Sequence, residues 1–175
     1  MSSDVALASI PRRVVAYAID VVLAFAGVVA LQAVLLPINP LFGGVTSPSG
    51  VLLHAWVTLT VTVLIVLFFG WRWASPSGAT PGMRLLRLRV RTASGGRVPM
   101  PRALLRALVL LVPFEVNHAV LFHPRPIWDS PSPGFRMGFV VVYALLFLYL
   151  AVTLRSSQRQ GPHDLAAGSI VSRSE

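Results

Sequence analysis

The sequence predicts an all-α membrane protein with four transmembrane helices, a short cytoplasmic interfacial hairpin and a short C-terminal cytoplasmic helix. Hydrophobic residues make up 55% of the 175 residues. Charged residues make up only 12%, about half of the fraction that is usual in soluble domains. The apolar residues also form long runs, and a helix needs ~20 such residues to cross a bilayer. Composition and run length together therefore indicate an integral membrane protein.

The four apolar runs predict helices in one domain that comprises the whole chain, residues 1–175. Their expected bounds are about 12–36, 51–71, 101–122 and 135–154. The first run is too long for the apolar part of a signal peptide and contains Asp20, so we expect an uncleaved helix there. Pro113 is expected to kink the third helix. Proline and glycine are frequent at 37–50 and 123–134, which predicts loops.

The segment between the second and third helices, residues 72–100, is cytoplasmic in this interpretation and is the most basic part of the chain. Residues 72–106 contain eight arginines and no acidic residue. In RLRVR (87–91) cationic and apolar side chains alternate, which is typical of a strand with one apolar and one cationic face. SGG (94–96) then favours a turn. We therefore expect a short hairpin on the membrane surface.

The polar cytoplasmic tail, residues 155–175, predicts a second short structured segment. In GPHDLAAG (161–168) the Gly-Pro pair can begin a helix and the last glycine can end it. Asp164 then falls in the first turn, where backbone N–H groups and the helix dipole favour a negative charge. SIVS (169–172) can continue as a strand beside residues 85–92. This pairing would bring Asp164 to the arginine-rich segment.

Arginine supplies all 15 basic residues, and its distribution predicts the orientation of the chain. Most arginines lie before the first helix, in residues 72–106 and in the tail. The other two connections contain Arg125 and, at a helix edge, Arg136. The positive-inside rule therefore places both termini in the cytoplasm, with four crossings of a bacterial inner (plasma) membrane. If the third helix were only re-entrant, the arginines of the tail would lie outside, against this rule.

The same arginines determine which partners we expect. A formal net charge of +9 is compatible with nucleic-acid binding, but the arginines lie beside the apolar runs, as membrane topology requires. We expect no nucleic-acid partner. Instead, the arginines in residues 84–106 are expected to bind anionic headgroups of the lipid bilayer. A homo-oligomer, or a complex with a partner membrane protein, is also compatible with the sequence.

Asp20 is an unusual residue in the middle of a membrane helix, where a charged carboxylate costs at least ~2.5 kcal/mol. Arg13 lies seven residues earlier on the same face, but ~10 Å away along the helix axis, so the two cannot pair comfortably. Asp20 can stabilise the fold, either in an ion pair with an arginine from another element or as a protonated carboxyl that is hydrogen-bonded to a neighbour. It can also line a path for protons or cations. The sequence leaves both interpretations open.

Glu115 and His118 form a second polar group, three residues apart on one face of the third helix. Carboxylates and histidines inside membranes are the usual parts of proton relays. The pair can belong to such a relay, or it can be a local polar contact unrelated to Asp20, which is the simpler interpretation. His54, near the outer end of the second helix, is interpreted as an interfacial residue.

The sequence does not predict an enzyme, a metal site or a cofactor. The chain has no cysteine, and its four histidines have no metal-ligand spacing. His163 and Asp164 form a pair that also occurs in metal-dependent phosphohydrolases, but the remaining ligands of such a site are missing. The sequence contains no Ser-His-Asp arrangement and no phosphate-binding glycine loop.

Three parts of the chain occur in the order of the signature blocks of a known family. They are RVVAYAID (13–20); GATPGMRLLRLRV (78–90) with SGGR (94–97) and RALLRALV (102–109); and RQGPHDLAAGSIV (159–171). Together they resemble the RDD family of prokaryotic membrane proteins, over about residues 9–172. That family is named for one arginine and two aspartates, which correspond here to Arg13, Asp20 and Asp164.

The blocks also contain further polar candidates. Arg84 and Arg106 lie in the second block, and His163 lies in the third. Met83 departs from the family, whose members commonly have lysine at this position. The departure removes one cation beside the membrane, so no role is transferred to Met83.

The resemblance implies a role in transport, and certain members of the family resemble cation/proton antiporters. The first hypothesis is therefore a small transporter that exchanges cations for protons, with Asp20 as the titrating group and Arg13 and Asp164 at the cytoplasmic mouth. Four helices are few for alternating access, so such a transporter is expected to oligomerise. The alternative is a non-catalytic scaffold or accessory subunit. In that case Arg13, Asp20 and Asp164 hold the fold together, and the basic hairpin binds anionic lipid or a partner membrane protein.

Overall fold

The computed structural model describes residues 7–35, 37, 49–128 and 134–174. Four of the described helices are long and apolar enough to cross a membrane, which confirms the predicted membrane protein with four spans. They are α1 (Ile10–Leu35); a second span, Gly50–Ala74, built from α2 (Gly50–Val57), the π-helical turn η2 (Thr58–Thr62) and α3 (Val63–Ala74); α5 (Met100–Phe122); and α6 (Phe135–Arg155).

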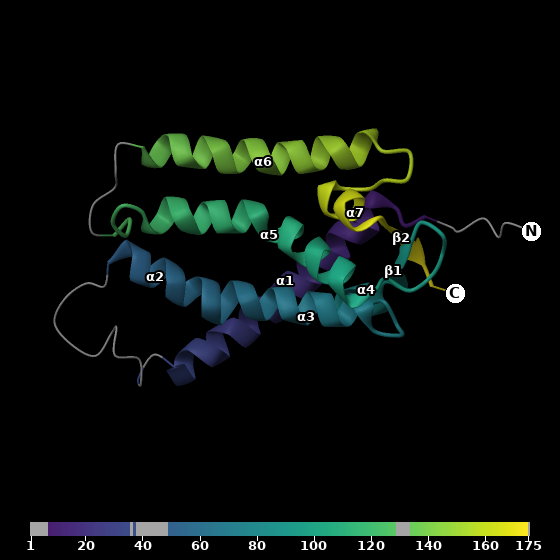
Figure 1. Cartoon of the computed structure of the whole chain (residues 1–175), viewed down its shortest axis with the longest axis horizontal. Coiled ribbons are helices and arrows are strands. Elements are labelled where there is room, and N and C mark those ends of the chain that lie inside the picture. The colour runs from purple at the N-terminus through teal and green to yellow at the C-terminus, as the bar shows by residue number, and fades with distance from the viewer. Residues whose placement is uncertain (1–6, 36, 38–48, 129–133, 175) are drawn as a thin grey trace, which may run out of the picture.

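Four short elements gather at one end of the spans (Figure 1). They are α4 (Pro81–Leu85), β1 (Leu88–Thr92), α7 (Pro162–Ala167) and β2 (Ser169–Arg173), which we call the platform. α1 and α5 begin at the platform, whereas α3 and α6 end there, so successive spans run in opposite directions. Leu7 and Ser172 form an isolated β-bridge in the platform, so both described ends of the chain lie at this side.

β1 pairs with β2 in a two-stranded antiparallel sheet, with Leu88 opposite Arg173 and Thr92 opposite Ser169. The predicted strand pairing between the basic segment and the tail is therefore confirmed. The predicted hairpin is wrong, although a turn does follow β1, closed by the Thr92 N–H, which donates to the Gly96 carbonyl at 2.9 Å. Residues 97–99 after this turn form no strand, because Pro99 lacks a donor N–H and α5 begins directly after it.

The hydrophobic core lies where the platform meets the adjoining ends of the spans. Its largest fully buried apolar side chains are those of Trp73, Met83, Leu88, Val90, Val98 and Val171. The second span continues to Ala74, past its predicted end at 71, because Trp73 enters this core and stacks on Phe69 with 5.0 Å between ring centroids. The core therefore holds the platform directly against the membrane spans.

Away from the platform, the spans bury few side chains against one another. Val142 is the one buried residue of α6, and α1 buries only Arg13, Ala16 and Asp20. α1 packs mainly against α4, whereas α5 packs against α3, α6 and α7 and is the central helix of the bundle. The apolar sides of α1 and α6 remain exposed, as is expected for surfaces that contact lipid.

α5 bends between its two halves (Figure 1), as predicted from Pro113 in its interior. Proline has no N–H, so the carbonyl of Val109, four residues earlier, loses its helical hydrogen bond. The Tyr149 hydroxyl of α6 donates to this carbonyl at 2.5 Å. A backbone group left unpaired by the proline is thus satisfied from the neighbouring span, as the low-dielectric membrane interior requires.

Candidate functional site

Asp164 lies in the first turn of α7, inside the platform. The helix begins at Pro162, and the backbone N–H of Gly161 donates to Oδ2 of Asp164 at 3.2 Å. Gly168 ends the helix with a φ of +59°, a left-handed conformation that glycine adopts without strain. The predicted helix and the predicted capping role of Asp164 are therefore confirmed.

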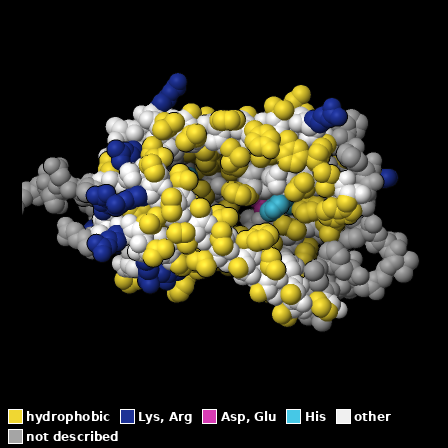
Figure 2. All heavy atoms as spheres, turned by 180° about the vertical axis from the view of Figure 1, so that it is seen from behind, with side chains coloured by type: hydrophobic (Ala, Val, Ile, Leu, Met, Phe, Trp, Pro, Cys, Tyr) yellow, Lys and Arg dark blue, Asp and Glu magenta, His cyan; other side chains and the backbone are white. Residues whose placement is uncertain are grey.

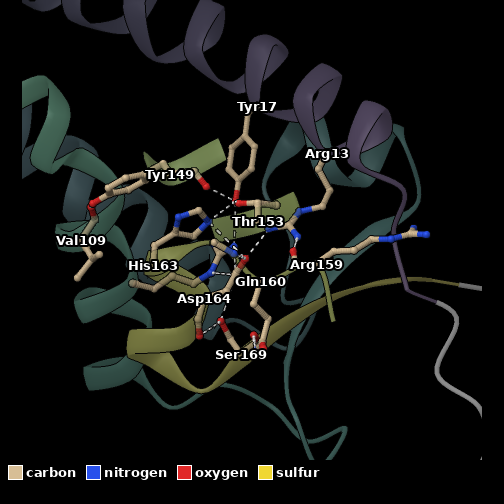
Figure 3. A network of polar contacts seen from close by, with 12 residues as sticks. Arg13, Tyr17, Val109, Tyr149, Thr153, Arg159, Gln160, His163, Asp164 and Ser169 are labelled. Atoms are coloured by element: carbon tan, nitrogen blue, oxygen red, sulfur yellow. Dashed lines mark hydrogen bonds and ion pairs between the residues drawn. The ribbon is translucent and has the colours of Figure 1, made fainter. Parts of the chain in front are cut away.

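Two arginines from two different membrane spans also bind the Asp164 carboxylate. Arg106 of α5 donates from Nε at 2.9 Å and from Nη2 at 2.7 Å to Oδ1. Arg13 of α1 donates from Nη2 to Oδ2. Figure 3 shows Arg13 extending from α1 towards Asp164. The side chains of Arg106 and Asp164 have no solvent exposure, so the pair is stabilised by strong electrostatic contacts, and loss of one partner would leave a buried charge uncompensated.

Aromatic and hydroxyl groups complete the surroundings of Arg106. Its Nη2 also donates to the Tyr17 hydroxyl at 2.9 Å, and its Cζ lies 3.9 Å from the centroid of the Trp73 ring. The negative face of an aromatic ring attracts a guanidinium group. Ser169 Oγ lies 3.3 Å from Oδ1 of Asp164. We call Arg13, Tyr17, Trp73, Arg106, His163, Asp164 and Ser169 the Asp164 cluster.

His163 is a buried and uncharged member of this cluster. Its Nε2 lies 3.5 Å from the Tyr17 hydroxyl and 3.4 Å from Oδ2 of Asp164 (Figure 3). Burial lowers the pKa of His163 to about 3, and the positive charges of Arg106 and Arg13 act in the same direction, against the opposite effect of Asp164. His163 is therefore neutral at neutral pH.

The charge of Asp164 follows from the same surroundings. Burial by itself would raise the pKa of Asp164, but the guanidinium groups of Arg106 and Arg13 lower it below its ordinary value. Asp164 is therefore a carboxylate over the whole physiological range. The cluster holds two guanidinium groups and one carboxylate, and each oxygen of this carboxylate contacts one of the arginines.

Asp20 lies apart from this cluster, at the contact between α1 and α4. It accepts hydrogen bonds from the Thr80 hydroxyl and from the backbone N–H of Gly82, the latter at 2.8 Å. The predicted ion pair with an arginine is not formed by any described residue. Asp20 is hydrogen-bonded to neighbouring residues, as the other interpretation expects, and its carboxyl oxygens are the acceptors. Gly82 is required for this approach, since a Cβ there would lie 2.3 Å from the carbonyl oxygen of Ala16.

Glu115 is the centre of a second cluster, between the second span and α5. Its Oε2 lies 3.2 Å from Nε2 of His54 and 3.3 Å from the Thr58 hydroxyl. Its Oε1 accepts from the Thr62 hydroxyl and lies 3.4 Å from Nδ1 of His118, so the predicted proximity of Glu115 and His118 is confirmed.

His54 also belongs to this second cluster. Its Nδ1 lies 2.9 Å from Nε2 of His123, the residue that follows α5. A signal for this arrangement is present in the sequence, because His54, Thr58 and Thr62 are spaced by four residues and so share a helix face. We call Glu115 and its neighbours His54, Thr58, Thr62, His118 and His123 the Glu115 cluster.

Arg84 belongs to neither cluster. Its guanidinium group is exposed and donates to Ser77 Oγ at 3.0 Å. In the described part of the chain, Arg13 and Arg106 are the only arginines in ion pairs. Most of the basic side chains in view gather at one end of the molecule, a few lie at the opposite end, and apolar side chains cover much of the surface between them (Figure 2). Among the described residues, no group of histidine and acidic side chains is placed to hold a metal ion.

Comparisons with known proteins identify the family of the chain. A search of curated proteins gives no match, and a search of solved structures gives none either. The sequence model of the RDD family matches residues 7–168, a range that contains all four spans and residues Arg13, Asp20 and Asp164. The chain therefore belongs to the RDD family of membrane proteins.

Proposed function

We propose that the protein exchanges a cation for protons across the membrane. One observation carries this proposal: Asp20 and Glu115 lie in membrane spans, their described hydrogen-bond partners are hydroxyl, backbone amide and imidazole groups, and neither forms an ion pair with a described arginine. A carboxylate in a low-dielectric interior is costly unless its charge is compensated. Such a group is neutralised by a proton or by a bound cation, and alternation between the two is the elementary step of exchange.

The two carboxyl groups lie at different depths. By the helical rise, Asp20 is about 15 Å from the start of α1 at the platform, and Glu115 is about 22 Å from the start of α5. Glu115 is therefore closer to the opposite side of the membrane. We assign Asp20 to the platform side of the exchange path and Glu115 to the opposite side.

The hypothesis from the sequence places Asp164 at the cytoplasmic mouth of the transport path, but we now assign it a structural role. Its charge is compensated by Arg13 and Arg106, and its side chain is fully buried. A carboxylate with two guanidinium partners has little tendency to exchange a proton for a cation. We therefore assign Arg13, Arg106 and Asp164 to the joint between the spans and the platform rather than to the transport path.

Orientation and assembly complete the proposal. The exposed arginines of the platform support a cytoplasmic position for this end, with the spans in the plasma membrane. The number of spans supports an oligomer, because four spans offer few surfaces for an alternating path within one chain.

Flux measurements on the purified protein in liposomes test the exchange. A sodium, potassium or lithium gradient is applied in turn, and proton movement is followed with a pH-sensitive dye inside the vesicles. We expect Asp20→Asn and Glu115→Gln each to abolish cation-driven proton movement while the thermal unfolding midpoint stays within a few degrees. Gly27→Ala is the control, since a Cβ at Gly27 meets nothing within 4 Å. A wild-type protein that moves no protons with any of the three cations contradicts the proposal.

A second candidate function is a non-catalytic membrane module that binds anionic lipid. It is favoured by the exposed arginines Arg84, Arg87 and Arg102, which form no ion pair with a described residue. Each arginine near an anionic surface contributes ~1 kcal/mol. The test variant carries Arg84→Gln, Arg87→Gln and Arg102→Gln together. We expect added phosphatidylglycerol, but not phosphatidylcholine, to raise the unfolding midpoint of the wild type more than that of this triple variant. Equal shifts in both proteins contradict this function.

A further inference from the structure

We propose that His123, His54 and Glu115 form a proton relay that connects the side of the membrane opposite the platform with the interior of the bundle. The relay rests on the proposed function, because it supplies the route by which protons reach Glu115. It uses residues outside the three that give the family its name.

The three side chains form one continuous line of contacts. His123 Nε2 lies 2.9 Å from Nδ1 of His54, and His54 Nε2 lies 3.2 Å from Oε2 of Glu115. Both nitrogen atoms of the His54 ring are therefore occupied, one on each side. The ring bridges the segment after α5 to a carboxylate in the middle of α5.

The hydrogen atoms in this line have one consistent arrangement when Glu115 is ionised. A carboxylate only accepts, so the hydrogen of His54 is on Nε2. A neutral imidazole has a single N–H, so Nδ1 of His54 is an acceptor and Nε2 of His123 is the donor. Both hydrogen bonds then point towards Glu115, which is the direction in which a proton would travel.

Proton transfer along this line is balanced. A proton from water binds Nδ1 of His123, the Nε2 proton of His123 moves to Nδ1 of His54, and the Nε2 proton of His54 moves to Oε2 of Glu115. One proton has entered, Glu115 is neutral, and both rings are neutral with the hydrogen on the other nitrogen. Both hydrogen bonds are then kept with donor and acceptor exchanged, so that Glu115 donates to His54 and His54 donates to His123. When Glu115 binds a cation, the same steps in reverse return the proton to water.

The surroundings of the relay leave it partly open. The side chains of His54 and Glu115 are 23% and 29% exposed, in contrast to the fully buried Asp164. Figure 2 shows an acidic side chain beside a histidine in a hollow of the apolar surface.

The other groups that face Glu115 are two threonine hydroxyls and one imidazole. The hydroxyls of Thr58 and Thr62 donate to Glu115, and Nδ1 of His118 lies 3.4 Å from Oε1. His118 is the remaining titratable group in contact, and no described arginine forms an ion pair with Glu115. Both threonines belong to the π-helical turn η2, a distortion that is frequent at functional sites.

Gly50 allows the two segments that carry His54 and His123 to pack closely. A Cβ at this position would lie 1.7 Å from the carbonyl oxygen of Phe122 and 3.3 Å from that of Pro124. The start of α2 can therefore pack against the end of α5 because Gly50 has no side chain. This packing sets the distance between His54, one turn later in α2, and His123.

Conservative variants test the relay in the liposome assay. Asparagine at 123 and glutamine at 54 can still form hydrogen bonds, but neither can gain and release a proton at neutral pH. We expect His123→Asn and His54→Gln to slow proton movement on the order of 100-fold, the magnitude of general acid–base catalysis. Arg125→Gln, an exposed change in the same connection, is expected to keep the wild-type rate. Unchanged rates in both histidine variants overturn the relay but leave the exchange itself standing.

Nuclear magnetic resonance of the imidazole nitrogens gives a readout that does not depend on transport, because it identifies which nitrogen of each ring carries the hydrogen. In both directions of the line, His54 and His123 carry it on the same kind of nitrogen, either both on Nε2 or both on Nδ1. We expect this agreement in the wild type. Two rings that carry their hydrogens on different kinds of nitrogen overturn the relay even where the variants lose flux, because the loss would then reflect structure.

Discussion

Arg106 holds one carboxylate oxygen of Asp164 with two nitrogen atoms, Nε at 2.9 Å and Nη2 at 2.7 Å. The two residues are separated by 58 positions in the chain, and the pair joins the central span α5 to the platform helix α7. Both side chains are fully buried. The pair therefore connects the membrane-embedded and the membrane-flanking parts of the protein at a place where water cannot replace either partner.

Removal of the Asp164 charge is expected to destabilise the protein strongly. Asp164→Asn leaves the guanidinium groups of Arg13 and Arg106 without a counter-ion, and loss of one partner of a buried ion pair costs ~3–5 kcal/mol. The thermal unfolding midpoint of the protein in detergent, followed by tryptophan fluorescence, measures the effect.

Arg102→Gln is the control for this change. Arg102 lies on α5, one turn before Arg106, but its side chain is exposed. An exposed charge contributes about 1 kcal/mol or less, so its loss should shift the midpoint only slightly. Similar shifts for Arg102→Gln and Asp164→Asn would mean that the buried ion pair does not stabilise the joint.

The close approach of α1 and α4 predicts a second destabilising change. Gly82→Ala would place a Cβ 2.3 Å from the Ala16 carbonyl oxygen and 3.1 Å from Oδ1 of Asp20. Overpacking of this kind costs ~1–3 kcal/mol, and the displaced α4 would also lose its hydrogen bond to Asp20. We expect a lower unfolding midpoint for this variant.

Gly27→Ala provides the matched comparison. Gly27 lies in α1, and a Cβ there meets nothing within 4 Å, so the higher helix propensity of alanine should leave the midpoint unchanged or raise it. If both alanine variants behave alike, the contact between α1 and α4 is looser than the distances at Gly82 indicate.

The four spans were predictable from sequence because a membrane imposes a minimum length on each apolar run. The partner of β1 was harder to predict. The alternation in residues 87–91 indicates a strand, but it does not say which segment supplies the second one. The start of α5 at Met100 occupies the segment after the turn, so the tail strand with its buried Ile170 and Val171 pairs instead.

The residues of the candidate sites were predictable from the sequence, but their contacts with one another were not. The family resemblance identifies Arg13, Asp20 and Asp164, but it does not say which aspartate receives the arginines. That depends on α7 docking beside the platform ends of α1 and α5, a contact between segments far apart in the chain. The spacing of His54 on the second span likewise indicates a polar face, whereas its contact with Glu115 depends on how α2 packs against α5.

The buried neutral state of His163 predicts a pH dependence of stability. The pKa of His163 is about 3 in the folded protein, against an ordinary value of 6.5. Between these two values the unfolded chain takes up a proton that the folded protein does not, so protonation favours unfolding. Stability should be constant above pH 6.5 and should fall as the pH is lowered below it, by ~1.4 kcal/mol per pH unit for this one proton.

His163→Gln isolates this contribution, since glutamine does not titrate. Unfolding midpoints of both proteins are measured from pH 7 to pH 5, where Asp164 remains ionised in the folded and unfolded states because its ordinary pKa is 3.8 and folding lowers it. We expect the wild-type midpoint to fall more steeply than that of the variant. Parallel curves would indicate that His163 becomes protonated in the folded protein.

The hydrogen bond between Tyr149 of α6 and the bend of α5 predicts that the effect of a Tyr149 substitution on stability depends on Pro113. Tyr149→Phe removes the donor to the Val109 carbonyl, which Pro113 leaves without a helical partner. Hydrogen bonds between membrane helices are worth ~0.6 kcal/mol on average and up to ~1.7 kcal/mol, so a measurable loss of stability is expected.

Pro113→Ala should reduce this loss, because an alanine N–H can restore the helical hydrogen bond to Val109. A double-mutant cycle of Tyr149→Phe and Pro113→Ala measures the difference from the free energies of unfolding of the four proteins. The expected result is a smaller effect of Tyr149→Phe in the alanine background. Additive effects would mean that the tyrosine hydroxyl stabilises the pair of helices independently of the group that the proline leaves unpaired.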